Sequence, residues 1–269
     1  MPELPEVETV VRELRTRLPG KTISKYTVFW SKTFVNKSSF DLEGQKIRFI
    51  GRKGKYIIFQ LDHSSMIIHL RMTGQLRFLS DDNRTLPEHI RFRLHFADGS
   101  YLLFNDPRKF GRIYHLNDEK FLLDKVGIDA LDQNFTCELF IEMARRHQMN
   151  IKAFLLSQKF VSGLGNIYVD ESLFRAGIHP ASICNRIPAG RLERLYSDIN
   201  EVLRFAVRNM GSTISDYRDA YGNPGKNQLF FRVYQRENLP CSNCATPIEK
   251  IRVAGRGTRI CKVCQKLYR

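Results

Sequence analysis

Two pairs of cysteines near the C-terminal end of the sequence constrain the fold more than any other feature. Cys241 and Cys244 form one C-x-x-C pair, Cys261 and Cys264 form a second, and residues 245–260 lie between them. Each pair offers two thiolates from one turn, and two such pairs can surround a tetrahedral zinc ion. Four protein ligands leave no open coordination position, so we expect one structural zinc ion that holds the intervening hairpin.

The other two cysteines, Cys137 and Cys184, have no close partner in the sequence. This usage is typical of a metal site in a reducing compartment rather than of a disulfide-bonded secreted domain. The start of the chain lacks the apolar run of a signal peptide, and no stretch approaches the roughly 18 apolar residues that span a bilayer. We therefore expect a cytoplasmic protein, associated with the nucleoid of a bacterial-type cell, with no secretion signal and no membrane partner.

An excess of positive charge indicates a polyanionic partner. The 269 residues include 43 Lys and Arg against 28 Asp and Glu, a formal net charge of +15. Nucleic acid is the favoured partner. An acidic membrane surface is less favoured because no strongly basic amphipathic helix is present, and a basic protein without a polyanion partner is the remaining alternative. Within A-G-R-G-T-R, Arg256 lies between two glycines that allow a phosphate backbone to approach closely.

The N-terminal half of the chain has the pattern of a β domain preceded by one helix. Pro5 and the acidic residues around it suit a helix start, and Pro19-Gly20 ends an apolar stripe that reaches Leu18. Residues 22–117 then contain short runs of β-branched and aromatic residues separated by turns. We expect an antiparallel sandwich or barrel capped by the first helix.

Beyond about residue 120 the apolar residues recur with helical spacing, most clearly in residues 191–210. Residues 211–228 are polar and glycine-rich, which predicts a long loop of the kind that is often functional or mobile. The fold class is therefore α+β and multidomain. The expected domains are a β-sandwich with a leading helix at 1–120, a helical domain at 121–234 and a zinc finger at 235–269.

A glycine-rich turn precedes one of these helices. In V-S-G-L-G-N-I-Y, Gly163 and Gly165 allow the turn to approach a ligand, and the free N–H groups of the following helix favour an anion. Asn166 at this position is equally explained by helix capping. The basic character of the chain favours phosphate binding here.

The opening residues M-P-E-L-P-E suggest a nucleophile. If Met1 is removed, Pro2 presents a secondary amine whose pKa near 8 makes it a better nucleophile than an ordinary lysine. Its adduct with a sugar carbon is a charged iminium that can accept electrons during elimination, and Glu3 could move the protons. On these residues alone, a proline that merely precedes a helix start is the simpler interpretation.

Several motifs taken together favour Pro2 as a nucleophile over a proline that merely precedes a helix start. The segments M-P-E-L-P-E-V-E, G-K-Y-I-I-F, H-L-R-M-T-G, D-P-R-K-F-G-R, G-L-G-N-I-Y-V-D-E and the two C-x-x-C pairs occur in the order of the formamidopyrimidine-DNA glycosylase family, which the chain resembles from residue 2 to its end. The resemblance implies a helix-two-turn-helix enzyme that excises 8-oxoguanine and formamidopyrimidines from double-stranded DNA and cuts the strand by β/δ elimination. It also implies a monomer without an organic cofactor.

The resemblance further implies roles for individual residues. Pro2 would attack C1′ of the damaged nucleotide, Glu3 would be the catalytic acid and base, and Lys55 would contact phosphate and position the substrate. Three residues would fill the gap left by an extruded base, as apolar wedges and as a hydrogen-bond donor to the orphaned cytosine. The DNA-contacting residues implied in this way are Glu6, Met72, Arg108, Phe110, Lys152, Asn166 and Arg256.

Two departures and two alternatives remain open from the sequence. Arg71 stands where the family often has glycine beside Met72, and V-Y-Q-R replaces the more usual V-Y-G-R before the zinc module. The endonuclease VIII branch of the same superfamily prefers oxidised pyrimidines and tends to open P-E-G-P-E, unlike this chain. A non-catalytic protein that binds damaged DNA is the alternative from another functional class.

Overall fold

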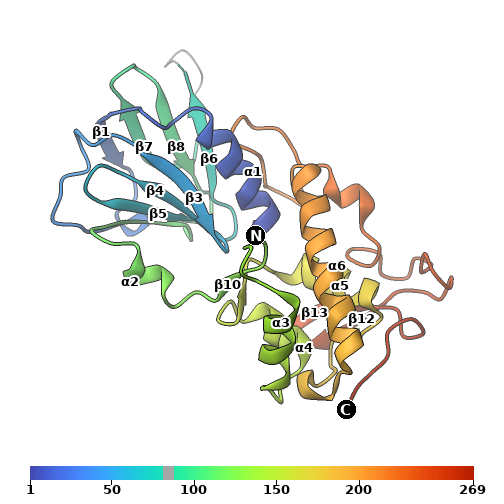
Figure 1. The fold of residues 1–269 in the computed structure, drawn as a ribbon. Coiled ribbons are helices and arrows are strands. Elements are labelled where there is room, and N and C mark those ends of the chain that lie inside the picture. The colour runs from blue at the N-terminus through green and yellow to red at the C-terminus, as the bar shows by residue number, and fades with distance from the viewer. Residues whose placement is uncertain (81–87) are drawn as a thin grey trace. The chain divides into compact units, whose positions relative to one another are not determined.

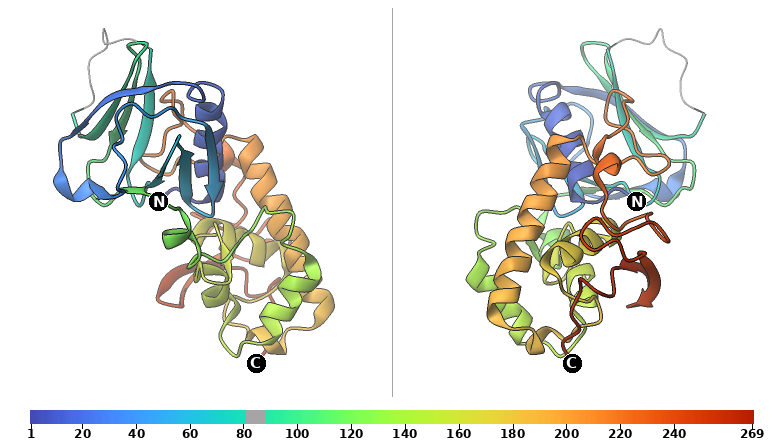
Figure 2. Two further views of the ribbon diagram at one scale, coloured as in Figure 1. Left: turned by 60° about the vertical axis from the view of Figure 1, so that its left-hand side comes forward. Right: turned by 90° about the vertical axis from the view of Figure 1, so that its right-hand side faces the viewer.

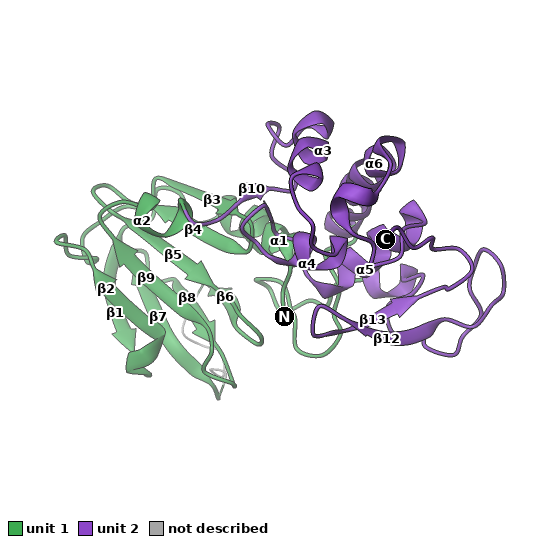
Figure 3. Ribbon diagram, turned by 90° about the horizontal axis from the view of Figure 1, so that it is seen from below, with its two compact units in different colours: residues 1–124, 209–226 green, residues 125–208, 227–269 purple. Residues whose placement is uncertain are grey.

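The computed structural model describes residues 1–80 and 88–269, which divide into two compact units (Figure 3). Unit 1 comprises Met1–Asp124 and Asn209–Lys226, and unit 2 comprises Lys125–Arg208 and Asn227–Arg269. The zinc-finger segment is thus grouped with the helices, and residues 209–226 with the N-terminal strands. The division into three domains at residues 120 and 234 stays a prediction.

Unit 1 is a β-sandwich with one long helix, α1 (Leu4–Arg15) (Figure 1). One sheet has the order β1-β7-β8-β6 and the other β2-β9-β5-β4-β3. Its remaining elements are a short α2 (Lys120–Leu123), a 3-10 turn (Ser31–Thr33) and the strands β1 (Ile23–Val28), β2 (Phe34–Lys37), β3 (Phe49–Lys53), β4 (Tyr56–Gln60), β5 (Ser65–His69), β6 (Gln75–Leu79), β7 (Ile90–Phe96), β8 (Tyr101–Asn105) and β9 (Arg112–Leu116).

The core of unit 1 lies between the two sheets and beneath α1. One apolar cluster joins residues of both sheets to the buried stripe of the helix. The central strand β5 is buried on both faces, because Ile58, Ile67, Leu116 and Leu123 form a second, smaller cluster. The expected sandwich is confirmed, and its strand pairs are antiparallel except for β2 and β9, which run parallel. This arrangement makes unit 1 a rigid support for the turns at its strand ends.

Helix α1 is shorter than the sequence pattern predicts. The expected stripe reaches Leu18, whereas the helix ends at Arg15 with Thr16 as its cap. After Arg15 the backbone N–H groups of Thr16 and Arg17 bond to the carbonyls of Glu13 and Leu14, three residues back, so the last turn tightens. Leu18 is still fully buried. An apolar stripe therefore continued beyond the helix because the following turn packs into the same core.

Unit 2 contains four principal helices and a C-terminal hairpin, and α5 packs against the long helix α6 (Figure 2). The stripe expected on the last helix is confirmed, since Leu192, Leu195, Ile199, Leu203 and Ala206 are all fully buried. The elements are α3 (Cys137–Arg145), α4 (Ile151–Leu156), α5 (Asn166–Ala176), α6 (Ala189–Arg208), the 3-10 turns Cys184–Arg186 and Asn227–Phe230, and the strands β10 (Ile128–Asp129), β11 (Val161–Ser162), β12 (Glu249–Val253) and β13 (Arg256–Ile260).

The polar loop that the sequence predicts after α6 is packed rather than loose in the part that belongs to unit 1. Tyr217 and Ala220 join the sandwich core, and Phe78 of β6 donates its backbone N–H to the Ala220 carbonyl. Among residues 1–80 and 88–269, none of the helices combines the length and apolar character that a bilayer-crossing segment needs.

Candidate active site and nucleic-acid interface

The first residues of the chain are fixed by a buried carboxylate. Glu6, only 2% exposed, accepts the backbone N–H of Glu3 through Oε2 at 2.8 Å and that of Ser212 through Oε1 at 2.7 Å. The first bond belongs to a capping box at the start of α1. The second joins this helix start to the polar loop 206 positions further along the chain. Glu6 therefore holds two segments of unit 1 at one point.

Pro2 and Glu3 lie directly before this helix and are both buried. The adjoining loop passes so close that a Cβ at Gly211 would lie 2.8 Å from Oε1 of Glu6, and Gly211 also has a φ of +72°. Only glycine meets both conditions without strain. The nitrogen of Pro2 and the carboxyl of Glu3 thus belong to one enclosed, preorganised segment.

Lys55 lies in the two-residue turn between β3 and β4, where Gly54 has a φ of +57°. The lysine is 5% exposed. Burial, followed by the charges of Arg71 and Lys55, lowers the pKa of His69 to about 3, so this histidine is neutral at physiological pH. Nδ1 of His69 accepts the backbone N–H of Arg71 at 3.0 Å. Lys55 is therefore placed beside the turn that carries Met72.

Two turns of unit 1 expose apolar side chains that the sequence assigns to base replacement. Met72 is 41% exposed and Phe110 is 48% exposed. In each turn the preceding residue adopts a left-handed backbone, with φ of +55° at Arg71 and +60° at Lys109. A preference for glycine at position 71 therefore has a backbone cause. The Arg108 guanidinium lies over the Phe110 ring at 5.1 Å.

Asp106 ties these two turns together and was missed in the sequence analysis. Its fully buried carboxylate accepts a hydrogen bond from Thr73 in one turn and, at 2.7 Å, from the backbone N–H of Gly111 in the other. Thr73 in turn accepts the backbone N–H of Arg108 at 3.4 Å. The aspartate heads the D-P-R-K-F-G motif, and the only sequence clue to its role is an acid directly before a turn-forming proline.

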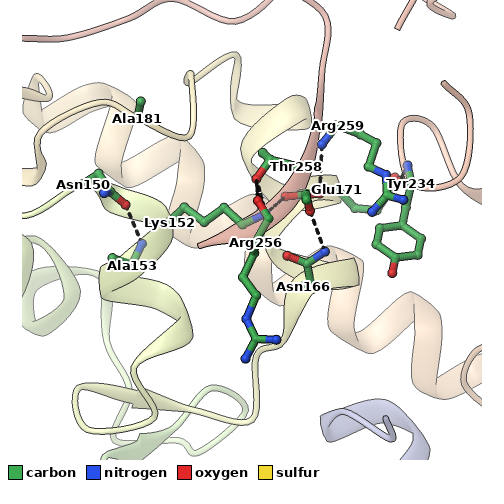
Figure 4. Close-up of polar contacts among 12 residues, drawn as sticks. Asn150, Lys152, Ala153, Asn166, Glu171, Ala181, Tyr234, Arg256, Thr258 and Arg259 are labelled. Carbon is green, nitrogen blue, oxygen red and sulfur yellow. Dashed lines mark hydrogen bonds and ion pairs between the residues drawn. The ribbon is translucent and has the colours of Figure 1, made fainter. Parts of the chain in front are cut away.

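In unit 2, the glycine turn and the zinc hairpin meet. Asn166 is the first residue of α5, and its Nδ2 donates to the carbonyl of Gly257 at 3.0 Å. Arg256 is exposed and neighbours Gly257 at the start of β13 (Figure 4). The two residues expected to bind phosphate are therefore brought together. The backbone N–H groups at the start of α5 add a partial positive charge to that of the arginine.

Lys152 occupies a different environment from the one expected of a DNA contact. Its side chain is 0% exposed and donates to Oδ1 of Asp170 at 2.6 Å and to Oγ1 of Thr258 at 2.8 Å (Figure 4). Burial raises the pKa of Asp170 to about 6, although Lys152 opposes this by favouring the carboxylate. The DNA contact of Lys152 stays a prediction, and this burial does not support it.

The four cysteines of the predicted zinc site converge. Their sulfur atoms all lie within 4.8 Å of one another, with 3.9 Å between Cys241 and Cys264 and 3.4 Å between Cys244 and Cys261. Ligands at 2.3 Å around a tetrahedral zinc are about 3.8 Å apart. The four residues therefore fit a structural zinc ion and, when it is bound, would clamp both ends of the β12–β13 hairpin.

The connection to this module is held by Glu171, a second residue that the sequence analysis missed. Its buried carboxylate accepts the backbone N–H groups of three successive residues, 232, 233 and 234, at 2.8 to 3.2 Å. Burial raises the pKa of Glu171, while these hydrogen bonds favour the charged form. The expected site residues thus fall into two groups, one in each unit, each organised by buried acids.

Comparison with known proteins identifies three consecutive family segments. Residues 1–113 match the formamidopyrimidine-DNA glycosylase N-terminal domain, residues 126–218 match the H2TH domain of the same enzymes, and residues 238–267 match the zinc finger found in FPG and IleRS. The helical and zinc-finger expectations are thereby confirmed.

Full-length relatives agree. The formamidopyrimidine-DNA glycosylase of Protochlamydia amoebophila is 40% identical over 276 residues, covering 99% of this chain and 100% of the relative. Two solved Lactococcus lactis structures, an FPG mutant with Fapy-dG-containing DNA and Fpg with abasic-site DNA, have TM-scores of 0.89 and 0.88 and identities of 37% and 38%. Each comparison covers 98% of this chain and at least 99% of the other. The chain therefore belongs to the formamidopyrimidine-DNA glycosylase family.

Proposed function

We propose that this protein excises oxidised purines from duplex DNA and cleaves the strand at the lesion, with Pro2 as the nucleophile. The family membership supports glycosylase activity, and the L. lactis complexes with Fapy-dG and abasic-site DNA support damaged duplex DNA as the substrate. The observation that carries the proposal is the Glu6 carboxylate, which binds both the backbone of Glu3 and the loop at Ser212. It preorganises the reacting segment before DNA binds.

The chemistry begins when removal of Met1 bares the ring nitrogen of Pro2. The nitrogen lone pair forms a bond to C1′, and the bond from C1′ to the base breaks, so the base leaves with that electron pair and takes up the proton that the Pro2 nitrogen loses. Glu3 donates a proton to the ring oxygen as the sugar opens, which leaves an iminium between Pro2 and C1′. Loss of a proton from C2′ then expels the 3′ phosphate, because the iminium accepts the electrons.

The two turns tied by Asp106 supply what base extrusion needs. Met72 and Phe110 offer apolar surface to an unstacked step, and Arg108 can donate hydrogen bonds to the orphaned cytosine. Asp106 keeps both turns in a fixed relation, since one carboxylate bonds to each. In unit 2, Asn166 and Arg256 would grip phosphates beside the lesion, and the zinc-bound cysteines would hold the hairpin that carries Arg256.

Borohydride trapping tests this function. Incubation with an 8-oxoguanine duplex and sodium borohydride should reduce the iminium and leave a covalent protein–DNA adduct. Protease digestion and mass spectrometry should find the DNA remnant on a peptide that begins at Pro2. Glu3→Gln, which keeps the size of the side chain, should lower the yield of trapped iminium and of strand cleavage at least a hundredfold, because no acid then protonates the ring oxygen.

Three results would contradict the proposal. An adduct on a lysine, for example Lys55, would exclude Pro2 as the nucleophile. Full activity of protein that retains Met1 would do the same. Preferential trapping on an oxidised-pyrimidine duplex would instead favour the endonuclease VIII-like alternative.

A further inference from the structure

A buried ion pair in unit 2 joins three elements that are distant in the sequence. Lys152 lies on α4, Asp170 on α5 and Thr258 on β13 of the zinc hairpin. Both charged side chains are 0% exposed. A fully buried pair is costly to desolvate and seldom adds net stability, but removal of one partner is strongly destabilising. Its location therefore suggests a role in fixing geometry.

The contacts converge on one stretch of the hairpin backbone (Figure 4). Oδ2 of Asp170 accepts the backbone N–H of Arg259 at 3.1 Å, and Oδ1 accepts Lys152 at 2.6 Å. Thr258, which accepts from Lys152, donates its own hydroxyl to the carbonyl of Arg256 at 3.0 Å. The carbonyl of Gly257, the residue between, accepts Nδ2 of Asn166 at 3.0 Å. Three successive hairpin residues, 257 to 259, are thus anchored to α4 and α5, and Arg256 is linked to them through Thr258.

We propose that Asp170 and Lys152 are positioning residues that set Arg256 against Asn166 in the phosphate grip, and that Lys152 acts through the hairpin rather than by touching DNA. Lys152 has no exposed surface through which to reach a phosphate, whereas Arg256 is exposed. Asp170 and Asn166 are four positions apart on the same helix, so they lie on one face of α5. The inference rests on the proposed role of Asn166 and Arg256 in binding phosphates.

The test uses the full-length, zinc-loaded protein and the salt dependence of its affinity for DNA. Each phosphate contact contributes about −0.9 to the slope of log K against log salt. Arg256→Ala should therefore flatten the slope by about one contact. Asp170→Asn should flatten it by a similar amount and weaken binding to an undamaged duplex about tenfold, because the arginine is no longer held in place. The double variant should bind within about twofold of Arg256→Ala alone.

Asp198→Asn provides the matched control. Asp198 is also a buried acid of unit 2, 1% exposed; it pairs with Arg194 of α6 at 2.8 Å and with Arg175 of α5 at 3.5 Å, and neither of these partners belongs to β13. Its substitution should lower the melting temperature and leave the salt slope unchanged. Zinc content is measured in each variant, and it should stay at one ion per chain, so that metal loss does not account for a change in binding.

A second variant separates positioning from folding. Lys152→Met with Asp170→Leu replaces the buried charges by apolar groups of similar size, which restores packing without a charged partner for the hairpin. We expect its melting temperature to exceed that of Asp170→Asn while its salt slope stays flattened.

An unchanged slope in Asp170→Asn, or strictly additive losses with Arg256→Ala, would overturn the inference. So would a loss of slope in Lys152→Met as large as that of Arg256→Ala if the Asp170 variants bind normally, because the charge of Lys152 would then contact DNA itself. These slopes are measured on undamaged duplex, so they remain informative if borohydride trapping refutes the proposed catalytic function.

Discussion

The β-sandwich of unit 1 and the zinc hairpin of unit 2 are stabilised in contrasting ways. The sandwich buries a continuous apolar core between two sheets and α1. Beside the hairpin lies a small cluster, in which Phe174, Val233 and Ile248 accompany buried cysteines. A segment this short cannot bury enough apolar surface to stay folded by itself. Buried polar contacts therefore add to an apolar core that already stabilises the sandwich, whereas in the hairpin they are a main support.

Removal of zinc should disrupt the hairpin and leave the sandwich folded, which is the largest expected difference between the two regions. Without the metal, the four thiols no longer clamp the hairpin, and Arg256 loses its fixed position. We expect duplex affinity to fall at least a hundredfold, while near-ultraviolet circular dichroism of the sandwich aromatics changes little. Fluorescence anisotropy before and after chelation, with zinc restored as the control, measures the effect. Retained affinity in metal-free protein would show that the polar contacts alone hold the hairpin.

Truncation of a core side chain in the sandwich should lower the stability of unit 1 and leave zinc binding by the hairpin unchanged. Phe104 is 0% exposed, and a Cβ at Gly111 would lie 2.2 Å from its ring, so this side chain packs directly against the turn that carries Phe110. Phe104→Ala should lower the free energy of unfolding by about 3–5 kcal/mol without releasing zinc. Urea denaturation measures the loss. Phe49→Ala, at a side chain that is 46% exposed, should change stability far less, and equal losses would undermine the contrast.

A pH-dependent contribution should come from the loop that packs on the sandwich. Glu13 accepts the backbone N–H of Ala220 at 2.7 Å, and burial, followed by the neighbouring Asp219, raises its pKa to about 7. The folded state therefore binds a proton that the unfolded state releases between pH 4.5 and 7. Stability should fall by about 1–2 kcal/mol as pH rises through this window, after allowance for solvent screening.

Glu13→Gln isolates this effect, because glutamine can still accept the Ala220 N–H but does not titrate. His69, whose pKa is lowered to about 3, acts in the opposite direction below pH 6.5 in both proteins and cancels in the comparison. Urea midpoints at pH 5 and pH 8 should therefore differ between the variant and the parent. Identical pH profiles would mean that Glu13 does not hold the proton.

The smallest effects are expected from glycine substitutions at left-handed backbone positions, one in a turn of unit 1 and one in the zinc hairpin. Arg71 has a φ of +55°, and Ala254, in the hairpin turn with Gly255, has a φ of +50°. Glycine removes the Cβ strain at such positions, so Arg71→Gly should stabilise unit 1 by about 0.5–1 kcal/mol. Ala254→Gly should instead slow zinc release to a chelator, because the hairpin depends on its metal. Slower zinc release in Arg71→Gly would contradict the expectation that stabilising unit 1 leaves zinc binding by the hairpin unchanged.

Several features of this protein follow from sequence alone because their determinants are local. The spacing of the cysteines predicts their convergence, since each pair needs only one turn to present two ligands. The β-branched and aromatic runs between turn residues predict the strands, and the apolar stripe predicts the buried face of α6. The wedge and donor roles of Met72, Arg108 and Phe110 come instead from the family resemblance and stay a proposal, although the structure exposes all three side chains.

Other features were decided by tertiary structure, because they depend on residues far apart in the chain. Glu6 meets Ser212, Asp106 meets Thr73, and Asp170 meets the backbone of Arg259, although no periodicity links these positions. Lys152 looks like any other lysine of a basic chain until folding places it beside a buried carboxylate. Local spacing determines which groups a segment offers, whereas the desolvation of a charge, and hence its role, depends on what the rest of the fold packs around it.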